Sequence, residues 1–210
     1  MLLGAIVLVF VIQGVASPDQ AEQILISALL GVTLLLSLWT AEAKPIVVRA
    51  AALVAAAVIL ASVLESVIGN SGGGATRIAN ALLVALAPPA IIVGVVRSLR
   101  AKQTVTLEAV FGVLCVYLLL GMLLAFIYGS IDRLGGYPFF AGGQSATVAR
   151  CLYYSFTTLT TVGYGDLTAR TNLGHTLSVF EALVGQIYLV TVVSLIVANL
   201  GRGRPASRAQ

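Results

Sequence analysis

The chain has 210 residues, of which 59% are hydrophobic and only 10% are charged. A soluble domain carries about 25% charged residues, and one of this size could not bury so much apolar surface while covering itself with polar groups. The composition therefore excludes an ordinary soluble protein and a disordered one, and it indicates a helical membrane protein.

Long apolar stretches predict six transmembrane helices. Five windows hold no Asp, Glu, Lys or Arg: 1–18, 23–41, 78–96, 109–131 and 182–201. A sixth apolar stretch carries only Arg49 and Glu65, near its ends, where charged side chains can reach the interface. Because a span needs about 20 apolar residues, we place the spans at 1–17, 24–41, 46–68, 79–97, 108–131 and 174–200.

The first segment has a second interpretation, a cleaved signal peptide over residues 1–16. Gly14-Val15-Ala16 fits a small-x-small cleavage site, but no Lys or Arg precedes Lys44, and a signal peptide begins with a basic region.

Lys and Arg predict the orientation. With both termini in the cytoplasm, eight of these residues lie inside and four lie outside. The inner set is Lys44, Arg49, Arg97, Arg100, Lys102, Arg202, Arg204 and Arg208, and the outer set is Arg77, Arg133, Arg150 and Arg170. The positive-inside rule favours this topology. We therefore expect a multi-pass protein of the cell membrane, whose partner is the lipid bilayer. The small size of the chain and its Ala-rich spans favour a bacterial inner membrane. Nucleic acid is not an expected partner, because the Arg residues are dispersed and form no basic face.

Residues 1–100 are expected to form a four-span membrane domain. Its fourth span, 79–97, contains no charge, and Pro88-Pro89 predicts a kink or break at its middle. Six spans invite comparison with voltage-gated channels, but voltage sensing needs several charges that move through the membrane field. We therefore predict weak or absent voltage gating.

Residues 101–210 show a different pattern. About 43 residues separate the last two spans, beginning with a Gly-rich loop that contains Tyr137, Phe139 and Phe140. Ser145 or Thr147 can cap a helix that runs to about Leu159. At roughly 20 Å this helix is too short to cross the bilayer. We predict a re-entrant pore helix, which must be shielded by protein or a water-filled cavity.

The sequence that follows this helix is TVGYGD, from Thr161 to Asp166. It resembles the selectivity-filter signature of potassium channels, and the order of span, loop, short helix, filter and span resembles their two-span pore module over about 107–200. The resemblance implies that four copies form one pore, a homotetramer, with K⁺ as the permeant ion and no cofactor. Ions would be coordinated by four residues: Thr161, Val162, Gly163 and Tyr164.

Neighbouring residues are expected to support the filter. Gly163 and Gly165 tolerate positive φ, which lets successive carbonyl groups point to one axis. The resemblance implies that Tyr164 packs against Tyr153 and Tyr154 of the pore helix, while Asp166 adds negative charge at the outer mouth. Family members can carry an acid four residues before the filter Thr, paired with the filter Asp, but this chain has Thr there.

Two residues in the last span stand out. Gly185 matches the hinge glycine of family inner helices and is our candidate for the gate, with close helix packing as the alternative. Glu181 is an acid inside the membrane, and such a group usually has a partner. We expect a polar pore-helix residue in that role, such as Thr157 or Thr158.

We therefore predict an all-α integral membrane protein that is a potassium-selective channel and not an enzyme, because clustered ionisable groups and a nucleophile–base pair are missing from the sequence. Only about ten residues follow the last span, so we expect no cytoplasmic regulatory domain, while a separate regulatory subunit stays open. The alternatives are a less selective cation channel and a small solute permease, although the repeats typical of permeases are not apparent.

Overall fold

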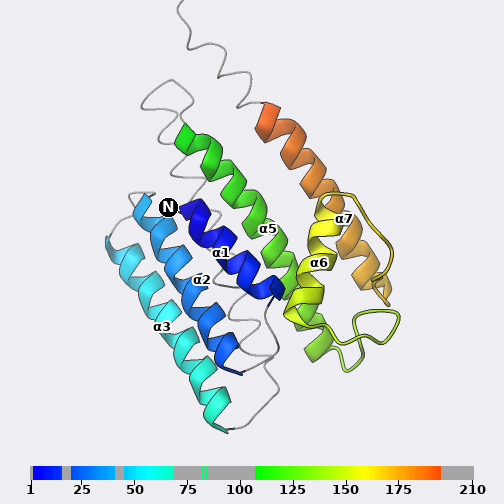
Figure 1. The fold of residues 1–210 in the computed structure, drawn as a ribbon, viewed down its shortest axis with the longest axis horizontal. Coiled ribbons are helices and arrows are strands. Elements are labelled where there is room, and N and C mark those ends of the chain that lie inside the picture. Colours follow the sequence, from blue (N-terminus) through cyan, green and yellow to red (C-terminus); the bar gives the residue numbers. More distant parts are fainter. Residues whose placement is uncertain are drawn as a thin grey trace, which may run out of the picture.

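The computed structural model describes residues 2–15, 20–40, 45–68 and 107–194, together with Leu82 and Val84. These residues are almost entirely helical (Figure 1). The helices are α1 (Leu2–Val15), α2 (Gln20–Thr40), α3 (Pro45–Ile68), α5 (Leu107–Leu134), α6 (Val148–Leu159) and α7 (Asn172–Tyr188), which continues into the π-helix η1 (Leu189–Val193).

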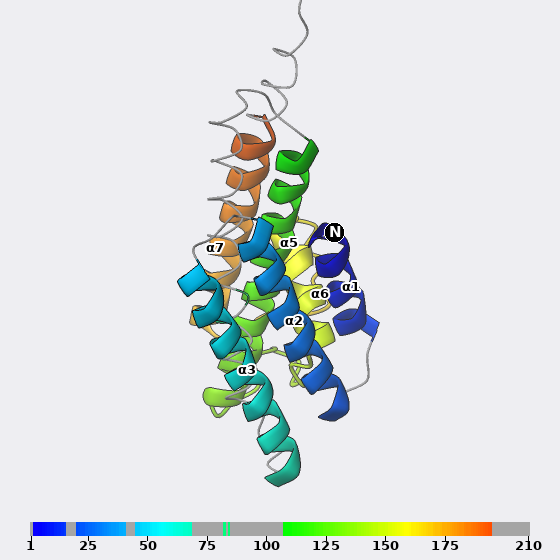
Figure 2. The same ribbon diagram turned by 90° about the vertical axis from the view of Figure 1, so that its left-hand side faces the viewer.

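The helices form two groups that meet at α1. Helices α2 and α3 pack on each other, α1 packs on α2, and the opposite side of α1 contacts α5 and α6 (Figures 1 and 2). Ile6 and Val9 of α1 are buried, and the ring of Phe10 meets Phe156 of α6 edge-on at 4.8 Å. The first helix of the chain therefore packs directly against the short helix α6.

Two helices in the described ranges are long and apolar enough to cross a membrane, over Val110–Leu134 and Asn172–Val192. The structure thus agrees with an all-helical membrane protein. Helices α1, α2 and α3 lie where the first three spans were predicted, and their crossing of the bilayer stays a prediction. Apart from Leu82 and Val84, the fourth predicted span lies outside the described residues, as do Pro88-Pro89 and the domain boundary near residue 100.

The loop between α5 and α6 folds back on the segment that follows residue 166. Phe140 and Ala169 form an antiparallel β-bridge, and the Arg170 N–H donates to the Phe139 carbonyl at 2.8 Å. The Phe139 N–H donates to the Asp132 carboxylate, also at 2.8 Å. This loop therefore connects the end of α5, at Asp132, with residues 169–170, which lie just before α7.

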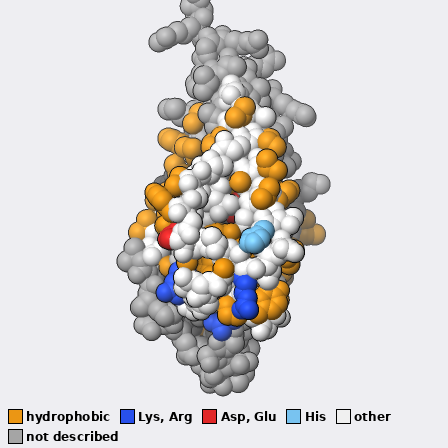
Figure 3. All heavy atoms as spheres, turned by 90° about the vertical axis from the view of Figure 1, so that its right-hand side faces the viewer, with side chains coloured by type: hydrophobic (Ala, Val, Ile, Leu, Met, Phe, Trp, Pro, Cys, Tyr) orange, Lys and Arg blue, Asp and Glu red, His pale blue; other side chains and the backbone are white. Residues whose placement is uncertain are grey.

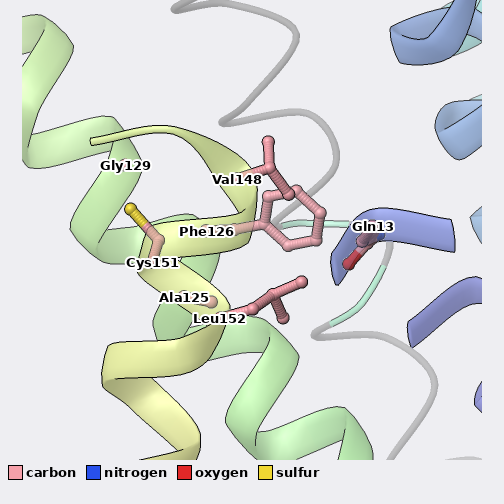
Figure 4. Close-up of a pocket in the computed structure, with 7 residues that line it drawn as sticks. All are labelled: Gln13, Ala125, Phe126, Gly129, Val148, Cys151 and Leu152. Carbon is pink, nitrogen blue, oxygen red and sulfur yellow. The ribbon is translucent and has the colours of Figure 1, made fainter. Parts of the chain in front are cut away.

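A small polar defect lies where α1 meets α5 and α6. The Gln13 side chain is 1% exposed and faces a cavity of about 10 Å³ (Figure 4). Ala125, Phe126, Gly129, Val148, Cys151 and Leu152 complete its lining. Neither amide atom of Gln13 has a hydrogen-bond partner in the part of the chain that the structure describes. Burying an unpaired amide costs stability, so this contact is not optimal.

Candidate ion-conduction site

Helix α6 begins at a side-chain cap and ends at the TVGYGD segment. Thr147 is the N-cap residue, and its hydroxyl accepts from the Arg150 N–H at 3.3 Å, so the structure selects Thr147 over Ser145. Leu159 is the last helical residue, as predicted, and is fully buried. With 12 residues, α6 is shorter than the helices beside it, and its partly negative C-terminal end carries the segment 160–166.

The backbone of this segment alternates in handedness. The φ angles of Thr161, Gly163 and Gly165 are +58°, +52° and +80°, whereas Val162 and Tyr164 between them are not in this region. The two glycines were predicted to be positive, but Thr161 was not. A β-branched residue pays about 1–3 kcal/mol for this conformation and keeps it only where its surroundings impose it.

Hydrogen bonds with α6 and α7 hold Thr161 in its positive-φ conformation. The Thr161 N–H donates to the Thr158 carbonyl at 2.9 Å, and the Gly163 N–H donates to the Thr157 carbonyl at 3.0 Å. From α7, the Gln186 Nε2 donates to the Thr161 hydroxyl at 3.0 Å. The first residues of the segment are therefore held by the last turn of α6 and by α7.

Tyr153 and Tyr164 lie against each other on the exposed side of α6. Their rings are nearly parallel, with 5° between planes and 6.2 Å between centroids. Desolvation and the nearby Asp166 carboxylate raise the pKa of the Tyr153 phenol. Tyr153 thus connects the pore-helix candidate with Tyr164 and lies near the Asp166 carboxylate.

Tyr154, the second tyrosine expected beside Tyr164, faces elsewhere. Consecutive residues of an α-helix differ by about 100° in direction, so Tyr153 and Tyr154 cannot share a face. The Tyr154 ring packs edge-on against Tyr128, Phe139 and Phe140, and its hydroxyl lies 2.6 Å from the Ser178 hydroxyl. The expected contact between Tyr154 and Tyr164 is therefore wrong within one chain, and Tyr154 instead joins α6 to α5, the outer loop and α7.

Gly185 lies where α7 passes closest to the end of α6. A Cβ atom added at Gly185 would overlap the Leu159 carbonyl oxygen and lie 2.9 Å from Leu159 Cδ1. The Tyr117 hydroxyl donates to the same carbonyl at 3.3 Å. This geometry supports the close-packing alternative for Gly185, while its role as a hinge stays a prediction. The irregular π-helical turn follows four residues later, at Leu189–Val193.

Glu181 is fully buried at the junction of three helices. The Tyr128 hydroxyl of α5 donates to its Oε2 at 2.6 Å, and the Ser155 hydroxyl of α6 lies 2.5 Å from its Oε1. The expectation of a pore-helix hydroxyl as partner is met by Ser155.

The two threonines named as candidate partners of Glu181 do not reach it. The hydroxyls of Thr157 and Thr158 both donate to the Tyr154 carbonyl, at 3.0 and 2.7 Å, and so remain on their own helix. These two examples were therefore wrong, because Ser155 is buried whereas Thr157 and Thr158 are only partly buried.

Sequence reasoning missed Ser155, Tyr128 and Gln186. Each lies within a predicted helix, and its hydrogen-bond partner is 25 to 53 positions away in the chain. A helical-face analysis of α6 could have found Ser155, since the buried residues of this helix are Cys151, Leu152, Tyr154, Ser155 and Leu159. No local pattern points to Gln186.

Comparison with known proteins agrees with this geometry. Residues 112–202 match the family model described as "Ion channel", a segment that includes most of α5, all of α6 and α7, and the TVGYGD sequence. The match covers less than half of the chain. The comparisons with curated proteins and with solved structures gave no match. Residues 112–202 thus match an ion-channel module, and this match points to a transport protein and not an enzyme.

Proposed function

We propose that this chain is one subunit of a potassium-selective channel whose filter is Thr161–Asp166. The observation that carries the proposal is the alternation of positive φ at Thr161, Gly163 and Gly165 in a segment that follows a short helix. In an extended strand, successive carbonyl groups point in opposite directions. Alternating handedness turns them toward one side, which is what a line of ion-coordinating oxygens requires.

The chemistry follows from the need to dehydrate the ion. A K⁺ ion that enters a narrow pore loses water, and carbonyl oxygens of Thr161, Val162, Gly163 and Tyr164 replace it. The Thr161 hydroxyl supplies a further ring of oxygens. The C-terminal end of α6 adds partial negative charge on the inner side, and Asp166 adds charge at the outer mouth.

The homotetramer that the resemblance to potassium channels implies is supported by what one chain leaves uncovered. Val162 and Tyr164 are 52% and 71% exposed, although irregular backbone at membrane depth must be covered by protein or line a water-filled cavity. Hydrophobic side chains also spread over the face formed by α7 (Figure 3). Four copies around one axis would bury these residues and complete each ring of oxygens.

The cellular setting is proposed from the sequence. Six spans would place both termini on the same side of a cell membrane, and the positive-inside rule favours the cytoplasmic side. The uncharged fourth span predicts weak or absent voltage dependence, because each charge that crosses the field contributes about 2.3 kcal/mol per 100 mV. A steep conductance–voltage curve in bilayers would contradict this prediction.

The test is the reversal potential of the purified protein in planar bilayers with K⁺ on one side and Na⁺ on the other. We expect a value near the K⁺ equilibrium potential, and its loss in Gly163→Ala and Tyr164→Ala. Gly143→Ala is the matched control for the first variant, because Gly143 also has positive φ (+72°) and open space around it but lies outside the filter.

Each outcome has a distinct meaning. Current that reverses near zero in the wild type indicates a less selective cation channel. Unchanged selectivity in both filter variants removes these residues from the ion path. Equal losses in Gly163→Ala and Gly143→Ala indicate a general folding defect. If no current appears, K⁺ flux into liposomes tests conduction without requiring a high open probability.

A further inference from the structure

The contacts of Glu181 restrict where hydrogen atoms can be. Three oxygen–oxygen contacts form one chain through this side chain. The Ser155 hydroxyl lies 2.7 Å from the Gly121 carbonyl oxygen and 2.5 Å from Glu181 Oε1, and the Tyr128 hydroxyl lies 2.6 Å from Glu181 Oε2. Each contact needs one hydrogen between its two oxygen atoms, because oxygen lone pairs that face each other at these distances repel.

An ionised Glu181 leaves this chain one hydrogen short. The hydroxyls of Ser155 and Tyr128 supply one hydrogen each, and a carboxylate supplies none. If Ser155 donates to the carboxylate, the Gly121 carbonyl faces the Ser155 oxygen without a hydrogen. If Ser155 donates to Gly121, a carboxylate oxygen at 2.5 Å faces a lone pair.

A neutral carboxylic acid satisfies all three contacts. Glu181 then donates through Oε1 to Ser155, Ser155 donates to the Gly121 carbonyl, and Tyr128 donates to Oε2. The surroundings favour this state, because Glu181 is fully buried and no Lys, Arg or His pairs with it among the described residues. The titratable groups around it are phenols: Tyr128 and Tyr117 from α5, and Tyr154 from α6, which itself packs against Tyr128.

We propose that Glu181 is a neutral acid whose proton closes a hydrogen-bond chain joining α5, α6 and α7, and that it is a positioning residue for the filter. Its partner Ser155 lies one turn before the end of α6, and the segment 160–166 continues directly from that end. The charge state stands on hydrogen-bond geometry and burial and is independent of the channel function, whereas the positioning role rests on the proposed channel function.

Infrared difference spectroscopy tests the charge state. We expect wild-type protein in lipid at neutral pH to show the carbonyl band of a protonated carboxylic acid, and Glu181→Gln to lose it. Asp132→Asn is the control, since Asp132 is a carboxylate that accepts a backbone N–H, and this variant should keep the band. Tyr128→Phe should shift the band upward, because the carbonyl oxygen loses its donor. Absence of the band, or its survival in Glu181→Gln, overturns the proposal.

Ion selectivity tests the positioning role. Glutamine can replace the neutral acid, since its NH₂ donates to Ser155 and its carbonyl accepts from Tyr128. We expect Glu181→Gln to keep the wild-type reversal potential and Glu181→Leu to lose it. Equal loss in both variants, or full selectivity in Glu181→Leu, overturns this role. If the leucine variant does not assemble, Ser155→Ala removes the link to α6 and is expected to lose selectivity in its place, with retained selectivity as the contrary result.

The two proposals fail separately. A wild-type protein that shows the acid band but does not select K⁺ contradicts the channel function and leaves the neutral acid standing. A selective wild-type channel without the band contradicts only the neutral acid.

Discussion

The contact between Gly185 and Leu159 offers a direct test of how α7 positions the end of α6. In Gly185→Ala, the new methyl carbon would overlap the Leu159 carbonyl oxygen and lie 3.1 Å from the Leu159 carbonyl carbon, where ordinary contact begins at 3.4 Å. The obstacle is backbone and not the end of a flexible side chain. The two helices must therefore separate by several tenths of an ångström or more.

The destabilisation by overpacking can be compared with the gain in helix propensity when glycine becomes alanine. Overpacking of this kind destabilises by about 1–3 kcal/mol, and replacing a helical glycine with alanine returns about 1 kcal/mol. Because the clash involves backbone, we expect a net loss of about 1–2 kcal/mol. The displacement falls on the residue that precedes Thr160, so K⁺ selectivity should fall together with stability.

Thermal unfolding in detergent and liposome flux with K⁺ or Na⁺ measure the two effects. Gly4→Ala is the matched control, because Gly4 is also helical but has nothing within 4 Å of the added Cβ. We expect this control to be neutral or stabilising, with unchanged selectivity. A Gly185→Ala variant that is as stable and as selective as the wild type would refute the reasoning. The close-packing interpretation of Gly185 would then be wrong, and the hinge interpretation would remain.

Three further substitutions test other contacts. Gln186→Leu removes the donor to the Thr161 hydroxyl, a bond worth about 0.5–1.5 kcal/mol, and should lower K⁺ over Na⁺ selectivity in bilayers; full selectivity would contradict it. Tyr153→Leu removes the ring parallel to Tyr164 and should shorten the lifetime of K⁺ currents, whereas Tyr153→Phe, which keeps the ring, should have a smaller effect. Gln13→Leu replaces a buried amide without a partner among the described residues and should raise stability by about 1–3 kcal/mol in thermal unfolding, with a loss as the contrary result.

The helices could be predicted because their signal is local. Charge-free windows and the short segment 147–159 placed α5, α6 and the start of α7 within three residues of their observed bounds, whereas the predicted end of the last span, residue 200, lies outside the described residues. The N-cap at Thr147 follows from the same local chemistry. The π-helical turn at Leu189–Val193 was not predicted, because its sequence, LVTVV, is that of an ordinary apolar helix.

The filter segment shows where local reasoning stops. Positive φ at Gly163 and Gly165 follows from glycine itself, but positive φ at Thr161 opposes the residue's own preference. Only tertiary contacts can impose it, and these come from Thr158 one turn earlier and from Gln186, 25 residues later. The same holds for Glu181, whose need for a partner was predictable while Ser155 and Tyr128 were not.

The geometry of the filter segment therefore depends on how α6 is held. Helix α5 contacts it through the Gly121 carbonyl and Ser155, α7 through Glu181 and Gly185, and α1 through Phe10, which meets Phe156. These contacts act on three sides of a helix only 12 residues long. A change at any of them moves the end of α6, and the strained Thr161 follows directly. Substitutions well away from the TVGYGD sequence should therefore alter selectivity and stability together, whereas substitutions on the exposed outer face of α3, such as Leu53, should alter neither.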